Sequence, residues 1–276
     1  MRLVSDNRAS RILFNFLSSN SFEKPFIVPA NVCEVIPSVY DEAGVEIVYS
    51  DVDSSCLCLD LRWVLKHINE YSGIIFVHTY GIENSFDLYF RTIKELNPDF
   101  IIIDDRCLCV PSFIPPSAFV DLCLFSVGEK KQVDFGKGGF AFIQNKMPYD
   151  VCEIKSDSFL NDASWYLDIR SIEEKRENAI VHRNRINAIY HRSLPKEIQL
   201  NDVFQNWRFN ILVNNKHCIL EALFANGLFA SSHYKPLTTA SYNANWLHDH
   251  VINLFNDYHF SEAMAIEACS IINGLL

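Results

Sequence analysis

The sequence lacks any run of about 18 apolar residues, the length that a membrane-spanning helix needs. Its first ten residues, MRLVSDNRAS, also lack the long apolar segment of a signal peptide. Basic residues are few relative to acidic ones: 24 Lys and Arg against 34 Asp and Glu give a net charge of −10. Because binding to phosphate backbones needs a basic face, this charge argues against a nucleic-acid-binding protein. We therefore expect a soluble, cytoplasmic protein with neither a membrane nor a nucleic acid as its partner.

The nine cysteines include no Cys-x-x-Cys pair, so the sequence contains no zinc-knuckle motif. Their number is odd, and most stand in apolar runs that are typical of strands, such as Cys56-Leu57-Cys58. This pattern suits a reducing compartment better than a secreted disulfide framework. Cys107-Leu108-Cys109 could bind a metal in principle, but alternation at the end of a strand is the simpler interpretation. We predict no metal site.

Short apolar runs alternate with helical patterns in the first half of the 276 residues. The hydrophobic fraction of 49% supplies a packed core and excludes a disordered chain or a coiled coil. Continuous β-branched and aromatic runs are typical of strands buried on both faces, and strand–helix–strand spacing predicts an α/β fold with a mainly parallel sheet flanked by helices. The runs are residues 26–28, 45–49, 73–77, 100–103, 122–125 and 139–143.

The pattern changes near Pro148, where a polar and irregular stretch over 150–175 begins. A charged helix is predicted over 173–193 and a last helix over 261–276, with strand-like runs between them. We therefore predict a large domain over residues 1–147 and a smaller C-terminal α+β domain over residues 148–276.

Two segments carry residues that are suited to chemistry. The apolar run 100–103 leads into Asp104-Asp105, and ligands of open α/β sheets bind outside the carboxyl ends of strands. Lys130-Lys131 stands between a strand and a glycine-rich turn, and a lysine desolvated in a pocket can attack a carbonyl group. Each segment alone has a simpler interpretation: a loop aspartate in the first case and exposed surface charge in the second.

Together these segments resemble the DegT/DnrJ/StrS family of sugar aminotransferases, which use pyridoxal 5'-phosphate and have the aspartate aminotransferase fold. The family signature is an aspartate after an apolar strand, then Ser-Phe-x-x-x-Lys, then Gly-x-Gly-Gly. Here Ser126 opens the second motif, and residues 136–139 supply the third. The resemblance selects Lys131 rather than Lys130 as the Schiff-base lysine. It implies that Asp105 pairs with the pyridine nitrogen of the cofactor and that Ser126 contacts the cofactor phosphate.

The resemblance extends to other cofactor-binding positions. Asp6-Asn7 can cap the helix that follows, and free amides at a helix start attract phosphate. Asn7, Arg8 and Ala9 stand where the family holds the phosphate. Cys33 occupies the position of the group that covers the cofactor ring, and Leu108 replaces a Gln or His that contacts the cofactor hydroxyl. Further matching segments are residues 28–33, 43–45, 51–53, 77–81 and 233–237.

The resemblance implies an aminotransferase that acts on a keto sugar, expected to be nucleotide-linked, with an amino donor such as glutamate. It also implies a homodimer with a shared active site and a role in polysaccharide biosynthesis. Two alternatives remain. A sugar dehydratase of the same fold carries histidine in place of Lys131, which argues against it here. A non-catalytic relative that binds a sugar nucleotide or a partner is favoured by Cys33 and Leu108, but opposed by Asp105, Ser126 and Lys131.

Overall fold

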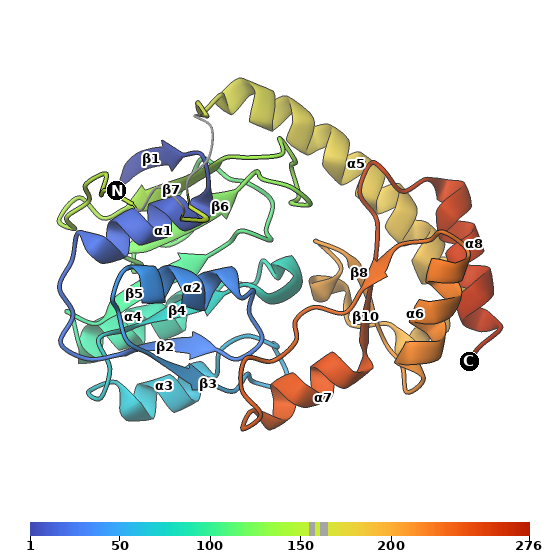
Figure 1. Ribbon diagram of the computed structural model, residues 1–276, viewed down its shortest axis with the longest axis horizontal. Coiled ribbons are helices and arrows are strands. Elements are labelled where there is room, and N and C mark those ends of the chain that lie inside the picture. Colours follow the sequence, from blue (N-terminus) through green and yellow to red (C-terminus); the bar gives the residue numbers. More distant parts are fainter. Residues whose placement is uncertain (155–157, 161–164) are drawn as a thin grey trace.

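Seven strands from the first half of the chain form one sheet (Figure 1). The computed structural model describes residues 1–154, 158–160 and 165–276. The strand order is β1-β7-β6-β5-β4-β2-β3; the strands from β2 to β6 are parallel, and β1 and β7 pair antiparallel at one edge. This confirms the predicted mainly parallel sheet. The strands are β1 (Arg2–Asp6), β2 (Phe26–Pro29), β3 (Ile47–Ser50), β4 (Gly73–Val77), β5 (Ile101–Asp105), β6 (Leu122–Ser126) and β7 (Gly139–Ile143).

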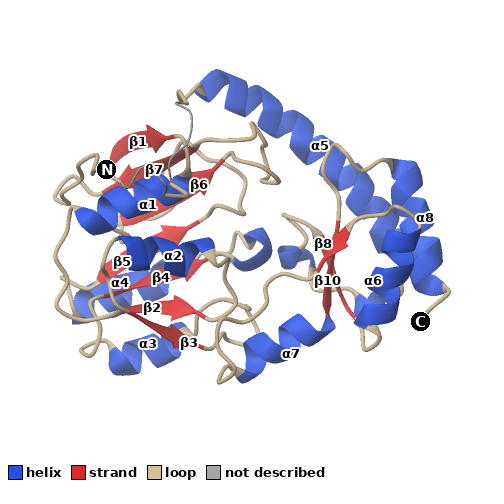
Figure 2. Ribbon diagram, viewed as in Figure 1, coloured by secondary structure: helices blue, strands red, loops and turns tan. Residues whose placement is uncertain are grey.

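Helices cover both faces of this sheet (Figure 2). Neighbouring residues of a strand point to opposite faces, so Ile75 and Ile103 belong to the apolar cluster under α1 and α2, whereas Ile74 and Ile102 belong to the cluster under α3 and α4. Apolar side chains are therefore needed at every position, which explains the continuous runs in the sequence. The helices are α1 (Ala9–Ser18), α2 (Val35–Glu42), α3 (Leu61–His67) and α4 (Asp87–Leu96).

The second half forms a smaller antiparallel sheet in the order β8-β10-β9. It has an apolar cluster of its own, in which helices α5, α6 and α8 pack on the strands. Three short 3-10 segments connect elements along the chain: η1 (Thr79–Gly81), η2 (Lys196–Ile198) and η3 (Asp202–Phe204). The remaining elements are α5 (Ile169–Ser193), β8 (Phe209–Leu212), α6 (Lys216–Ala225), β9 (Ala230–Ser231), α7 (Tyr242–His250), β10 (Val251–Leu254) and α8 (Glu262–Asn273).

The two halves also share apolar contacts, because Ile172, Phe204 and Trp207 join the cluster under α3 and α4. The large sheet ends at Ile143 and the small one begins at Phe209, while the domain boundary at residue 148 stays a prediction.

Several bounds differ from the sequence prediction. Helix α5 begins earlier, at 169, because the carboxylate of Asp168 accepts the amide of the third helical residue. Of the strand-like runs between α5 and α8, the one around residue 230 is reduced to the two paired residues of β9.

Within the part of the chain that the structure describes, no helix combines the length and the apolar character needed to cross a bilayer. The nine cysteines are free thiols, and no group of three or more His, Cys, Asp or Glu side chains among the described residues is placed to hold a metal ion.

Candidate active site

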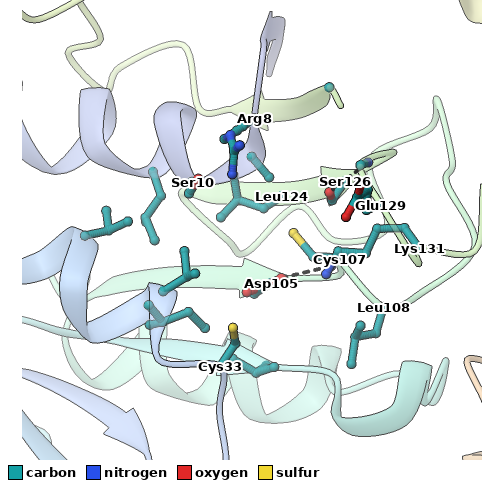
Figure 3. A pocket seen from close by; sticks show the side chains of 18 of the residues that line it. Arg8, Ser10, Cys33, Asp105, Cys107, Leu108, Leu124, Ser126, Glu129 and Lys131 are labelled. Carbon is teal, nitrogen blue, oxygen red and sulfur yellow. Dashed lines mark hydrogen bonds between the residues drawn. The ribbon is translucent and has the colours of Figure 1, made fainter. Parts of the chain in front are cut away.

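A cavity of about 400 Å³ lies at the carboxyl end of β5 and β6 (Figure 3). Its walls come from the first turn of α1, the start of α2, the end of β5 and the turn between β6 and β7. Tyr234 of the smaller part of the chain adds one further side chain. Of the site residues predicted from the sequence, the cavity lining includes Arg8, Ala9, Cys33, Asp105, Ser126 and Lys131.

The two adjacent aspartates of β5 face opposite sides of the sheet. Asp105 lines the cavity, and its Oδ1 accepts the amide of Cys107 at 2.8 Å, the bond dashed in Figure 3. Asp104 is fully buried and lies 2.7 Å from both His78 Nε2 and Arg106 Nε. Burial acts to raise the pKa of Asp104, but His78 and Arg106 outweigh it and hold the pKa below its usual value. The two basic side chains thus belong to Asp104, whereas the Asp105 side chain faces the cavity.

The two adjacent lysines also diverge. Lys131 lines the cavity with Asp105, whereas Lys130 lines a second cavity of about 710 Å³. Lys130 has a φ of +59°, and Asp134 supports this left-handed backbone by accepting the amides of Lys130 and Gly136, both at 2.7 Å. The turn therefore presents only the second lysine to the site that contains Asp105.

Two glycines allow β7 to meet the first turn of α1. A Cβ on Gly139 would lie 2.4 Å from the nitrogen of Ala9, and one on Gly138 would lie 2.5 Å from the Trp165 ring. Gly138 also has a φ of +106° and donates its amide to the carbonyl of Asn7 at 2.6 Å. Asn7 therefore anchors the turn through its backbone, and it lies outside the described lining of the cavity.

The N-terminus of α1 opens onto the cavity. Arg8 is the extended N-cap residue and makes no side-chain capping hydrogen bond, while Arg8, Ala9 and Ser10 line the cavity (Figure 3). The first amides of a helix have no intrahelical acceptor, and with the helix dipole they attract anions. This end of the cavity is suited to a phosphate group.

Several lining residues were not predicted as site residues, among them Ser10, Cys107, Glu129 and Tyr234. The hydroxyl of Ser10 directly follows the predicted phosphate residues, so its position in the first turn could have indicated it. Tyr234 follows the last of the other lining residues, Gly138, by about a third of the chain, and only the packing of the small sheet brings it to the cavity. Burial, followed by the nearby Cys33 and Asp105, raises the pKa of Tyr234 well above its usual value.

The two positions at which the sequence departs from the family pattern also line the cavity. Cys33 is exposed and Leu108 is 4% exposed. Neither adds a charged group, and the apolar Leu108 side chain offers no hydrogen bond to a ligand. The polar groups of the lining come instead from the start of α1, from Asp105 at the end of β5, and from the turn after β6, where Glu129 and Lys137 join Ser126 and Lys131.

The chemistry of this set fits pyridoxal phosphate. An anion-attracting helix end stands at one side, a carboxylate at the end of β5 and a primary amine beside it, in a cavity sized for a small aromatic ligand. Phosphate, ring nitrogen and aldehyde would each meet a group of matching chemistry. The backbone approach at Gly139, which any Cβ would obstruct, supports the same fit.

Comparison with known proteins gives structural matches only: no family model and no curated protein matches the chain. A DegT DnrJ EryC1 StrS aminotransferase from Brucella abortus has a TM-score of 0.74 at 17% identity, over 100% of this chain and 86% of that one. Helicobacter pylori PseC, an aminotransferase of pseudoaminic acid biosynthesis, has a TM-score of 0.75 at 16% identity, and the match covers 99% of this chain and 86% of that one. DesI, crystallised in the presence of its TDP-sugar product, has a TM-score of 0.78 at 14% identity, and the match covers 99% of this chain and 80% of that one. The chain therefore has the fold of the sugar aminotransferases, along nearly its whole length.

Proposed function

We propose that the chain is a pyridoxal-phosphate-dependent aminotransferase. The observation that carries this proposal is that one cavity brings together Asp105, Lys131 and the N-terminus of α1, which are separated in the sequence. The fold shared with sugar aminotransferases supports it.

Each of these groups has one task in this proposal. The bound cofactor supplies an aldehyde that holds amines and a ring that accepts an electron pair. The amine of Lys131 would hold the cofactor covalently and, once released, would itself accept the proton that leaves the α-carbon of the donor. Asp105 would keep a proton on the ring nitrogen, and Arg8, Ser10, Ser126 and the α1 amides would bind the phosphate. Overall, the CH–NH₃⁺ of the donor becomes C=O, and the C=O of the acceptor becomes CH–NH₃⁺.

We propose a nucleotide-linked keto sugar as the acceptor and an amino acid such as glutamate as the donor. The TDP-sugar product in the DesI structure supports this acceptor class. A homodimer with a shared site, a cytoplasmic location and a role in polysaccharide biosynthesis belong to the same proposal, and the family resemblance supports them.

A non-catalytic relative is the second candidate, favoured by Cys33 and by the apolar Leu108 at the cavity wall. Such a protein would bind a sugar nucleotide without retaining pyridoxal phosphate on a lysine. The arrangement of Lys131 beside Asp105 favours the enzyme.

The test is incubation with pyridoxal phosphate, borohydride reduction and peptide mapping, in the wild type and in Lys131→Ala and Lys130→Ala. We expect a visible absorbance band and a reduced adduct on Lys131, both lost in Lys131→Ala and kept in Lys130→Ala. Glutamate should then bleach the band of the unreduced wild type and release 2-oxoglutarate. An adduct on Lys130, or on neither lysine at saturating cofactor, would transfer support to the non-catalytic candidate.

A further inference from the structure

The turn that carries Lys131 is held from the smaller part of the chain at two consecutive carbonyl groups. Trp207 donates its indole Nε1 to the carbonyl oxygen of Lys130 at 2.9 Å. Arg183, on α5, donates Nη2 to the carbonyl oxygen of Lys131 at 3.2 Å. The backbone on which the reactive lysine stands is therefore linked to α5 and to the segment before β8.

Arg183 is an unusual residue for such a contact, because it is only 5% exposed. Its acceptors are all neutral: the carbonyls of Lys131 and Trp207, the latter at 2.6 Å, and the side-chain oxygen of Asn256. No ion pair of Arg183 with a carboxylate is found among the described residues. Burial, followed by the charge of Arg208, lowers the pKa of Arg183 to about 10, so the group is still a cation at neutral pH.

A buried cation without a carboxylate partner is costly, and such residues persist where they serve a specific arrangement. Two of the contacts of Arg183 join α5 to the segments around Trp207 and Asn256, which a purely structural residue would also do. The third reaches the turn between β6 and β7 and ends at the carbonyl of Lys131. The φ of +59° at the neighbouring Lys130 is supported within the turn by Asp134, so the contact of Arg183 acts on the residue that follows.

We propose that Arg183 is a positioning residue that holds the backbone of Lys131 so that its amine faces the cavity with Asp105. The catalytic role of Arg183 rests on the proposed function. Its effect on the orientation of the Lys131 side chain does not need a bound cofactor, so this effect and the proposed function can be refuted separately.

The experiment compares Arg183→Met and Arg183→Lys with Arg185→Met as the matched control. Arg185 is an exposed arginine two residues along the same helix. The first readout uses cofactor-free protein: competitive labelling of amines with acetic anhydride, mapped by peptide, with exposed Lys235 as the internal reference. Loss of one hydrogen bond to the Lys131 carbonyl should change its labelling relative to Lys235 by about 2- to 10-fold in Arg183→Met. Arg183→Lys, which keeps one charged donor, should restore part of the wild-type ratio, and Arg185→Met should match the wild type.

The second readout uses protein with pyridoxal phosphate and follows the pH midpoint of the visible band. Arg183→Met should shift this midpoint, and borohydride should trap some cofactor on Lys130. Wild-type labelling and midpoint in a folded Arg183→Met protein that is merely less stable to urea would overturn the proposal. If Arg183→Met does not fold, Arg183→Lys decides in its place, because one amine cannot replace both donor nitrogens of the guanidinium: a labelling ratio and a midpoint equal to those of the wild type would then overturn the proposal. A wild type that binds no pyridoxal phosphate, but shows the labelling change, would refute the proposed function alone.

Discussion

Substitution of Gly139 by alanine should separate the phosphate-binding role of α1 from the general stability of the fold. The new Cβ would lie 2.4 Å from the nitrogen, 2.6 Å from the Cα and 2.9 Å from the Cβ of Ala9. These atoms belong to the backbone and first turn of α1, so no flexible side chain can move aside. To restore an ordinary contact, the end of β7 and the start of α1 must separate by about 0.8–1 Å.

The magnitude follows from this displacement. Overpacking of this kind costs about 1–3 kcal/mol in the free energy of unfolding. The helix end contributes about 1–2 kcal/mol to an anion held in good geometry, and each 1.4 kcal/mol is a factor of ten in affinity. We therefore expect the dissociation constant of pyridoxal phosphate to rise by about 5- to 30-fold. The control is Gly274→Ala, where the added Cβ would have its nearest contact at 3.5 Å and the backbone φ is −73°.

The assay combines urea unfolding followed by circular dichroism with a titration of pyridoxal phosphate, repeated in competition with inorganic phosphate. Gly139→Ala should weaken both ligands, and Gly274→Ala should match the wild type in every measurement. A Gly139→Ala protein that loses stability but binds pyridoxal phosphate and phosphate with wild-type affinity would refute the assignment of α1 as the phosphate site. Unchanged stability would refute the close approach itself.

Three further substitutions test the assignments of Asp105, Asp104 and Ser10. Asp105→Asn should still take up pyridoxal phosphate but slow the conversion of glutamate by about 100-fold or more in stopped-flow absorbance, because a neutral amide no longer holds a proton on the ring nitrogen; a wild-type rate would contradict this role. Asp104→Asn should lower the free energy of unfolding by about 3–5 kcal/mol in urea, since it leaves His78 and Arg106 buried without their carboxylate. The pKa of Asp104 is lowered in the folded protein, so its stabilising contribution is present above about pH 4 and is lost as the pH falls through the folded-state pKa. Below about pH 4, the free energy of unfolding of Asp104→Asn should therefore depend less on pH than that of the wild type. Equal slopes of this free energy against pH would contradict the assignment. Ser10→Ala should weaken pyridoxal phosphate by about 5- to 10-fold in a binding titration without a change in the urea midpoint, and unchanged affinity would place its hydroxyl outside the phosphate site.

The sequence by itself determined the class of the fold, because burial on both faces of a parallel sheet requires uninterrupted apolar runs and these runs are visible. It also identified Asp105, Lys131 and the start of α1 as candidate site residues, because they occupy positions in a series of motifs that resembles the family signature. The antiparallel edge strand β1 was not predicted, since its burial alternates and its partner, β7, is more than 130 residues away.

Only the tertiary structure gave the physical reason why one of two adjacent residues faces the site and the other does not. Asp104 and Asp105 are alike in the sequence, but strand alternation sends one to His78 and Arg106 and the other to the cavity. The contacts of Tyr234 and Arg183 likewise depend on where the small sheet packs, because residues far apart in the chain meet only when hydrophobic burial brings their elements together. Local sequence fixes the types of groups available, and long-range packing fixes which of them share one cavity.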